Sequence, residues 1–189
     1  MVQALRPGRW RLLALVAAVA LVSQAAHGAS DEYEVKAALI YKISKFVRWP
    51  ESSLVAGGGT LRLCVVGADS FGSRIDSLKG RTVQGLTIEI SRLPNQQDSI
   101  AGCQIAFISR SEQHRLASLL RAMEGSPALT ISDIDGFAAG GGMIDFATTD
   151  GKISFHINPG AAKRADIGIG SQLLQLATLV GEPPREAPQ

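Results

Sequence analysis

Apolar runs alternate with segments of helical character through the first half of the chain, and this alternation restricts the fold more than any other feature. The run over residues 61–66 is almost continuously apolar, as expected for a strand buried on both faces. The expected strands are 61–66, 86–91, 104–109 and 129–132, and the expected helices are 73–78 and 111–123. Strands and helices that alternate in this way predict a three-layer α/β domain, with a mainly parallel sheet flanked by helices.

The second half of the chain predicts an antiparallel hairpin. Two runs of alternating polarity, 143–149 and 152–157, are separated only by Asp150-Gly151, a dipeptide that strongly favours a two-residue turn. The turn sets a register that places apolar side chains opposite one another on one face: Ile144 with Ile157, Phe146 with Phe155 and Thr148 with Ile153. The other face pairs Asp145 with His156.

A closing helix is expected after the hairpin, between residues 158 and 180, with interruptions at Gly168 and Gly170. Its core-facing residues are expected to be Leu173, Leu174, Leu176 and Ala177. Residues 30–180 then form one domain, and 181–189 form a disordered tail.

An amphipathic helix is predicted near the start, over residues 31–49, where Pro50 ends it. The residues expected to face the core are Val35, Leu39, Ile43 and Phe46, with Ile40 and Val47 beside them. The positions expected to stay polar are Lys36, Lys42, Lys45 and Arg48. Basic amphipathic helices also bind membrane surfaces, so docking on the core and binding to a membrane are both open.

Residues 1–29 have the parts of an export signal. Three arginines precede an apolar run over residues 12–22, and residues 26–28 offer a cleavage site. The run is well short of the roughly 20 residues that a membrane span needs, although an uncleaved N-terminal anchor is the alternative. We therefore expect a cleaved signal peptide and a periplasmic protein.

The charge of the expected mature chain is near zero. The signal holds three of the 19 basic residues and no acidic residue, which leaves 16 basic against 17 acidic residues. Such a balance gives no strong positive electrostatic potential that would attract nucleic acid.

The chain has two cysteines, Cys64 and Cys103. In an oxidising compartment they are compatible with one disulfide, two free thiols or an intermolecular bond. A disulfide needs Cα atoms within about 7 Å. Cys64 lies within its expected strand and Cys103 just before the next, so a simple parallel register would separate them.

Side chains suited to catalysis or metal binding are not spaced for either. Segment 67–74 has the glycine spacing of a P-loop without the Gly-Lys-Ser/Thr ending. His114 and His156 show no metal-ligand spacing. Asp133 and Asp135 could form an acid/base pair, but the glycine that follows them favours a turn. We predict a protein that is not an enzyme and has no metal or cofactor.

Five blocks of sequence, taken in order, resemble the YfiR family of periplasmic proteins. The blocks are Tyr33 with Val35-Lys36-Ala37-Ala38, then 46–50, Gly136-Phe137 with 141–144, 153–158 and 171–174. The resemblance covers essentially the whole mature chain. It implies a non-enzymatic regulator, commonly a homodimer, that binds the periplasmic domain of an inner-membrane diguanylate cyclase and limits cyclic-di-GMP synthesis. It also implies that an outer-membrane lipoprotein can relieve the repression.

The resemblance also bears on individual residues. Cys64 and Cys103 match a cysteine pair of the family, which favours an intramolecular disulfide. Relatives can carry a second pair around the glycine-rich loop, where this chain has Ala138 and Asp145. The family's Phe-Glu-Ile-Asn block reads Phe155-His156-Ile157-Asn158 here.

We expect a partner-binding surface around His156, Asn158, Lys163 and Arg164. The competing function is a periplasmic sensor of small molecules. In that case the glycine-rich loop, residues 136–142, and the carboxyl ends of the strands would form a concave pocket.

Overall fold

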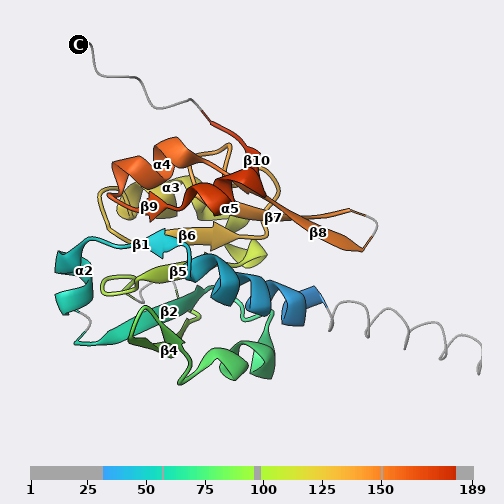
Figure 1. Cartoon of the computed structure of the whole chain (residues 1–189). Coiled ribbons are helices and arrows are strands. Elements are labelled where there is room, and N and C mark those ends of the chain that lie inside the picture. Colours follow the sequence, from blue (N-terminus) through green and yellow to red (C-terminus); the bar gives the residue numbers. More distant parts are fainter. Residues whose placement is uncertain (1–31, 57, 96–98, 150, 182–189) are drawn as a thin grey trace, which may run out of the picture.

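A mostly parallel sheet runs through the centre of the protein (Figure 1). The computed structural model describes residues 32–56, 58–95, 99–149 and 151–181, so the expected signal peptide, Asp150 and most of the expected tail lie outside the described residues. The order of the eight described strands is β10-β8-β7-β6-β5-β2-β4-β3. Their bounds are β2 Thr60–Val66, β3 Thr82–Val83, β4 Leu86–Leu93, β5 Ile105–Ile108, β6 Leu129–Ser132, β7 Ile144–Thr149, β8 Lys152–Ile157 and β10 Thr178–Leu179.

The strand directions confirm the predicted fold class. Strands β4, β2, β5, β6 and β7 are parallel, whereas β7 and β8 form an antiparallel hairpin. The hairpin has the predicted register, with Ile144 opposite Ile157, Phe146 opposite Phe155 and Thr148 opposite Ile153.

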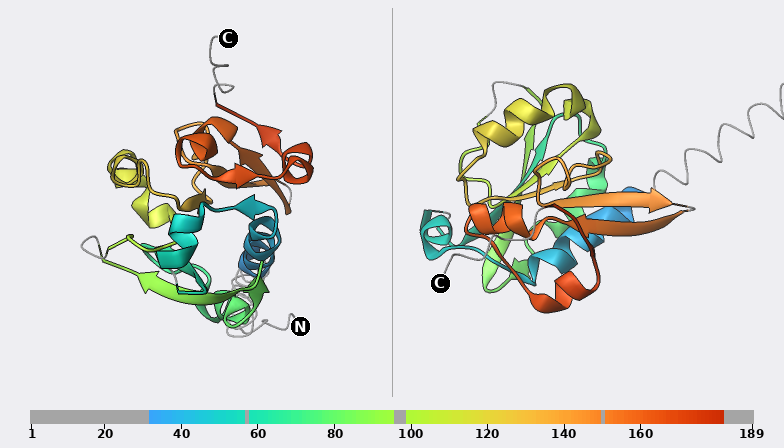
Figure 2. Two further views of the ribbon diagram at one scale, coloured as in Figure 1. Left: turned by 60° about the vertical axis from the view of Figure 1, so that its left-hand side comes forward. Right: turned by 90° about the horizontal axis from the view of Figure 1, so that it is seen from above.

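Helices cover both faces of the sheet (Figure 2). The helical elements are the first helix, residues 32–44, and α2 Glu51–Ala56, η1 Gly72–Leu78, η2 Arg110–Arg115, α3 Leu116–Ala122, α4 Pro159–Arg164 and α5 Ser171–Gln175. The predicted helix 111–123 is divided, because η2 is a 3-10 helix and only α3 is α-helical. No helix among the described residues has the length and apolar character needed to cross a membrane.

Two apolar clusters lie on the two faces of the sheet. On β5, Ile105 and Phe107 point into the cluster that contains the first helix, whereas Ala106 and Ile108 point into the cluster that contains Leu119 of α3. Because successive side chains of a strand alternate between faces, β5 is buried on both sides. This is the three-layer arrangement that the sequence predicts.

The first helix is shorter than predicted. It ends at residue 44, and Val47–Arg48 forms strand β1, which pairs with β9, Gly168–Ile169. Trp49 is buried and its indole N–H donates to the carbonyl of Gln104 at 2.9 Å. Pairing with β9 and this anchor at β5 hold the segment in an extended conformation.

The buried face of the first helix also differs from the prediction. Val35 and Phe46 are 47% and 40% exposed, whereas Lys36 is 1% exposed. The face that packs against the sheet contains Lys36, Ala37, Ile40, Ile43 and Ser44. The helix is rotated relative to the expected stripe because Lys36 pairs with the buried carboxylate of Asp133.

The closing helix predicted for residues 158–180, with interruptions at Gly168 and Gly170, is confirmed in part. It forms two short helices, α4 and α5, with strand β9 between them, and its last part contains strand β10 instead. Gly170 is extended, with ψ at 140°, and its N–H donates to the carbonyl of Phe46. Leu176, expected in the core, is 77% exposed. Pairing of β9 with β1 and of β10 with β8 replaces helical hydrogen bonds at the two ends of α5.

Candidate functional site

The four residues expected to bind a partner lie along β8 and α4. Lys163 and Arg164 are exposed in the last turn of α4. His156 is part-buried on β8, and its side chain is 33% exposed. Asn158 is only 5% exposed and precedes α4. The structure therefore brings Lys163 and Arg164 to one surface and leaves Asn158 inside.

Asn158 has a structural role that accounts for its burial. Its Oδ1 accepts from the backbone N–H of Ala161 at 2.9 Å and caps α4, and its Nδ2 donates to the carbonyl of Ala138 at 2.8 Å. One side chain thus joins the start of α4 to the glycine-rich loop. A partner could contact Asn158 only after displacing these bonds.

Asp145 holds the same loop from the sheet. Its Oδ2 accepts from the N–H of Ala138 at 2.9 Å, and its Oδ1 lies 2.5 Å from Nδ1 of His156, its cross-strand neighbour. The two positions where relatives can carry a second cysteine pair, Ala138 and Asp145, are therefore joined here by a hydrogen bond. Together Asp145 and Asn158 satisfy both backbone groups of Ala138.

The glycine-rich loop lines a pocket of about 230 Å³. The pocket lies at the amino ends of β6 and β7, not at the carboxyl ends of the strands as expected, because the loop crosses back to reach the start of β7. Its lining includes Met123, Thr130, Gly140, Gly141, Met143, Ala161 and Ala165, with Arg121 and Arg164 among the charged residues.

The carboxyl ends of β2 and β5 are filled by the protein's own side chains. The hydroxyl of Ser111 accepts from the N–H of Ala68 at 3.0 Å, and Glu112, which is 6% exposed, pairs with Arg115. A Cβ built on Gly67 would overlap both Ser111 and Glu112. This crevice, where ligands often bind in open parallel sheets, is closed.

The segment that resembles a P-loop forms a turn. Asp69 Oδ1 accepts from the N–H groups of Phe71 and Gly72 at 2.8 and 3.1 Å. These amides would have to face a phosphate in a P-loop. Asp69 Oδ2 pairs with Arg92, and hydrogen bonds to Asp76 and Asp69 raise the pKa of that guanidinium.

A buried polar cluster joins the first helix to the end of β6. Lys36 Nζ lies 2.9 Å from Asp133 Oδ2 and 2.6 Å from Glu32 Oε1, and the hydroxyl of Tyr33 donates to Asp133 Oδ2 at 2.7 Å. Among the described residues, two buried side-chain oxygens, Asp133 Oδ1 and Ser109 Oγ, have no hydrogen-bond partner.

Charge in this cluster is stabilised by internal bonds. Burial lowers the pKa of Lys36, but hydrogen bonds to Glu32 and Asp133 outweigh burial and raise it overall. The hydrogen bond to Lys36 lowers the pKa of Glu32, despite an opposing effect of burial. Helical periodicity places Lys36 on the polar face of the first helix, and the glycine after Asp133 and Asp135 favours a turn there. Residue spacing does not predict the ion pair between Lys36 and Asp133, because the two residues come from distant segments.

Cys64 and Cys103 form the expected disulfide, with Cα atoms 5.9 Å apart. The turn before β5, in which the N–H of Cys103 donates to the carbonyl of Ile100, accounts for this short distance. Ile100 packs against the apolar cluster on the α3 face of the sheet. The backbone at Cys103 therefore turns away from the direction of β5. The simple parallel register that would have separated Cys103 from Cys64 does not apply.

These observations define an α/β domain with a mostly parallel sheet, a C-terminal hairpin and buried polar groups that bond mainly to one another. The chain belongs to the YfiR/HmsC-like family, whose model matches residues 33–178. The family is periplasmic and regulatory, is not catalytic, and acts with membrane-bound regulators. It fits a periplasmic regulator of cyclic-di-GMP signalling.

No curated protein matches the chain. Among solved structures, one that is similar is the ABC domain in complex with L-Trp from Streptococcus pneumonia, with a TM-score of 0.47 and 11% identity. The alignment covers 68% of this chain and 58% of that one.

Proposed function

We propose that the protein is a periplasmic repressor that binds the periplasmic domain of an inner-membrane diguanylate cyclase and limits cyclic-di-GMP synthesis. The observation that carries this proposal is the family match over residues 33–178. A repressor of this kind acts by binding the inactive state of the cyclase more tightly than the active state. It needs a rigid binding surface and no catalytic group.

The end of α4 supports a partner surface of this kind. Lys163 and Arg164 are exposed, and Asn158 fixes the start of the short helix that carries them. Because both are cations, we propose that they contact carboxylates of the cyclase. The proposal includes a homodimer and an outer-membrane lipoprotein that competes for the repressor.

Deletion of the gene tests the function. We expect higher cyclic-di-GMP and more biofilm in the deletion strain, and restoration of low levels by the wild-type gene. The variant Lys163→Glu/Arg164→Glu should restore repression poorly, whereas the charge-matched control Arg62→Glu/Lys152→Glu, at two exposed cations away from α4, should restore it fully. Unchanged cyclic-di-GMP in a deletion strain that expresses its neighbouring cyclase would contradict the proposal.

The pocket beside the glycine-rich loop favours a second function, a periplasmic sensor of small molecules. Its lining combines apolar residues with Arg121, Arg164 and Glu124, which suits a small organic molecule with charged groups. Capture of a membrane cyclase by the mature protein supports repression. Thermal stabilisation by a metabolite without any protein partner supports sensing.

A further inference from the structure

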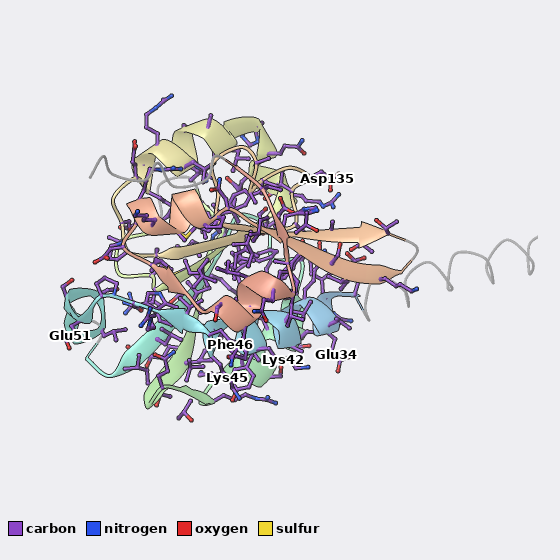
Figure 3. The ribbon with its side chains drawn as sticks, turned by 45° about the horizontal axis from the view of Figure 1, so that its top comes forward. Glu34, Lys42, Lys45, Phe46, Glu51 and Asp135 are labelled. Carbon is purple, nitrogen blue, oxygen red and sulfur yellow. A yellow bond between two sulfur atoms is a disulfide. The ribbon has the colours of Figure 1, made fainter. Side chains whose placement is uncertain are left out.

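The outward face of the first helix combines cations with exposed apolar side chains. Lys42 and Lys45 are exposed along this helix, and Phe46, at its end, is 40% exposed. Figure 3 shows these three side chains together on one side of the molecule, with Glu34 at one end of the row and Glu51 away from it. Arg48, on strand β1, is exposed two residues later.

Stacking on an aromatic ring holds two of the cations in place. Lys45 Nζ lies 4.4 Å from the centroid of the Tyr41 ring, and Arg81 Cζ lies 5.2 Å from the same centroid. Lys42, Lys45 and Arg48 form no ion pair with any residue of the described segments. The basic face, which we define as Lys42, Lys45, Phe46, Arg48 and Arg81, is thus a local excess of positive charge on a nearly neutral chain.

Exposed apolar side chains also occur on and near the first helix. The described residues contain four large exposed apolar side chains: Val35, Phe46, Leu176 and Leu179. Val35 lies on the first helix and Phe46 just after it, whereas Leu176 directly follows α5 and Leu179 lies on β10. All views place α5 beside the first helix (Figures 1, 2 and 3). Apolar side chains among lysines and arginines are typical of surfaces that bind the headgroup region of a membrane.

We propose that the basic face docks on the surface of an anionic membrane, with its cations on lipid phosphates and Phe46 at the headgroup boundary. The helix does not insert its apolar face, because that face packs against the sheet. A second copy of the chain is a poor occupant, since a two-fold contact would bring the same cations together. A protein partner is the other occupant, and the vesicle test below separates it from a membrane.

Membrane docking adds to the proposed repressor function and does not depend on it. The test uses the mature protein and vesicles of phosphatidylcholine, either pure or with phosphatidylglycerol, and measures co-sedimentation at low and high salt. We expect binding only to the vesicles with phosphatidylglycerol, and weaker binding at high salt because salt screens the attraction.

Variants locate the contact. Lys42→Glu/Lys45→Glu should lower the vesicle partition coefficient at least about tenfold, because each cation near the surface contributes separately. Phe46→Ser should lower it by a smaller factor, and Arg62→Glu/Lys152→Glu, at two exposed cations outside the basic face, should leave it unchanged. Thermal unfolding of each variant confirms folding.

Three results would overturn the proposal: no binding to anionic vesicles at low salt, equal loss of binding in the control variant, or a basic face that binds the cyclase domain but no vesicle. The vesicles contain no cyclase, so their failure to bind would leave the repressor proposal standing. Unchanged cyclic-di-GMP in the deletion strain would contradict the repressor proposal and would likewise leave membrane docking standing.

Discussion

Lys36 and Asp133 lie 97 residues apart in the sequence and form an ion pair in which both side chains are 1% exposed. The pair joins the first helix to the carboxyl end of β6. Charges that are taken out of water are stable only when each has a partner. Removal of Lys36 leaves Asp133 with a single cation among the described residues, the exposed Arg110 at 3.8 Å. Removal of Asp133 leaves Lys36 with the part-exposed Glu32.

We predict that Lys36→Ala lowers the free energy of unfolding by about 3 to 5 kcal/mol, because Asp133 stays buried without its closest cation and Arg110, 3.8 Å away, is exposed. The double variant Lys36→Met/Asp133→Leu should recover much of that loss, since neither charge remains. Urea denaturation of the single and double variants measures both effects. This account would be contradicted if the double variant lost more free energy of unfolding than the two single variants lose together.

The same cluster predicts a pH dependence. The folded pKa of Glu32 lies below its ordinary value of 4.5, so its contribution to stability is present above that value and is lost as the pH falls through the lower, folded pKa. The folded pKa of Lys36 lies above 10.5, so its contribution is present below 10.5 and is lost as the pH rises through the raised pKa. We expect Lys36→Met to flatten the stability profile at both extremes, with the smaller change in acid because Glu32 is 29% exposed. Parallel profiles for variant and wild type would show that other groups cause the pH dependence.

The fold class and the hairpin were predictable from the sequence, because strand and turn patterns are local. The register of the hairpin follows from the two-residue loop alone. The rotation of the first helix was not predictable from periodicity. Lys36 is stable in the core because it pairs with Asp133, which lies 97 residues later in the sequence. The division of the closing segment depends on pairing of β9 with β1 and of β10 with β8, which are also distant contacts.

The candidate partner site was predicted only in part. Residue type and position drew attention to Lys163 and Arg164, and both are exposed. Asn158 belongs to the same stretch but caps α4, a role that depends on hydrogen bonds within the folded chain. Sequence pattern cannot separate an asparagine that contacts a partner from one that holds a helix.

We predict that the disulfide contributes about 2 to 4 kcal/mol to stability, because it restricts the unfolded chain between two residues 39 positions apart. Reduction of the wild-type protein and the variant Cys64→Ala/Cys103→Ala should both shift the denaturation midpoint downwards. Thiol titration after denaturation without reductant should find no free thiol in exported protein. Two reactive thiols in that assay would contradict the bond.

Gly142 should not tolerate a side chain. A Cβ at this position would overlap the ring of Phe137, which is fully buried. We expect Gly142→Ala to destabilise the protein by about 1 to 3 kcal/mol, the usual cost of overpacking. Gly140→Ala in the same loop is the control, because its Cβ would lie 3.4 Å from the nearest atom. Similar losses in the two variants would show that the loop, and not the contact with Phe137, sets the cost.

Variants of Asn158 should lower stability, whereas variants of the cations of α4 should weaken partner binding. Asn158→Ala removes the cap of α4 and leaves the carbonyl of Ala138 with only the longer bond from the N–H of Gly141, so we expect a loss of about 1 to 3 kcal/mol in the free energy of unfolding. Lys163→Ala/Arg164→Ala removes no internal bond among the described residues and should change stability by less than about 0.5 kcal/mol. Binding of the purified cyclase domain, measured at a temperature where all variants are folded, should weaken for Lys163→Ala/Arg164→Ala and stay near the wild-type value for Asn158→Ala. The reverse order of affinities would place the contact at the start of α4 instead of its end.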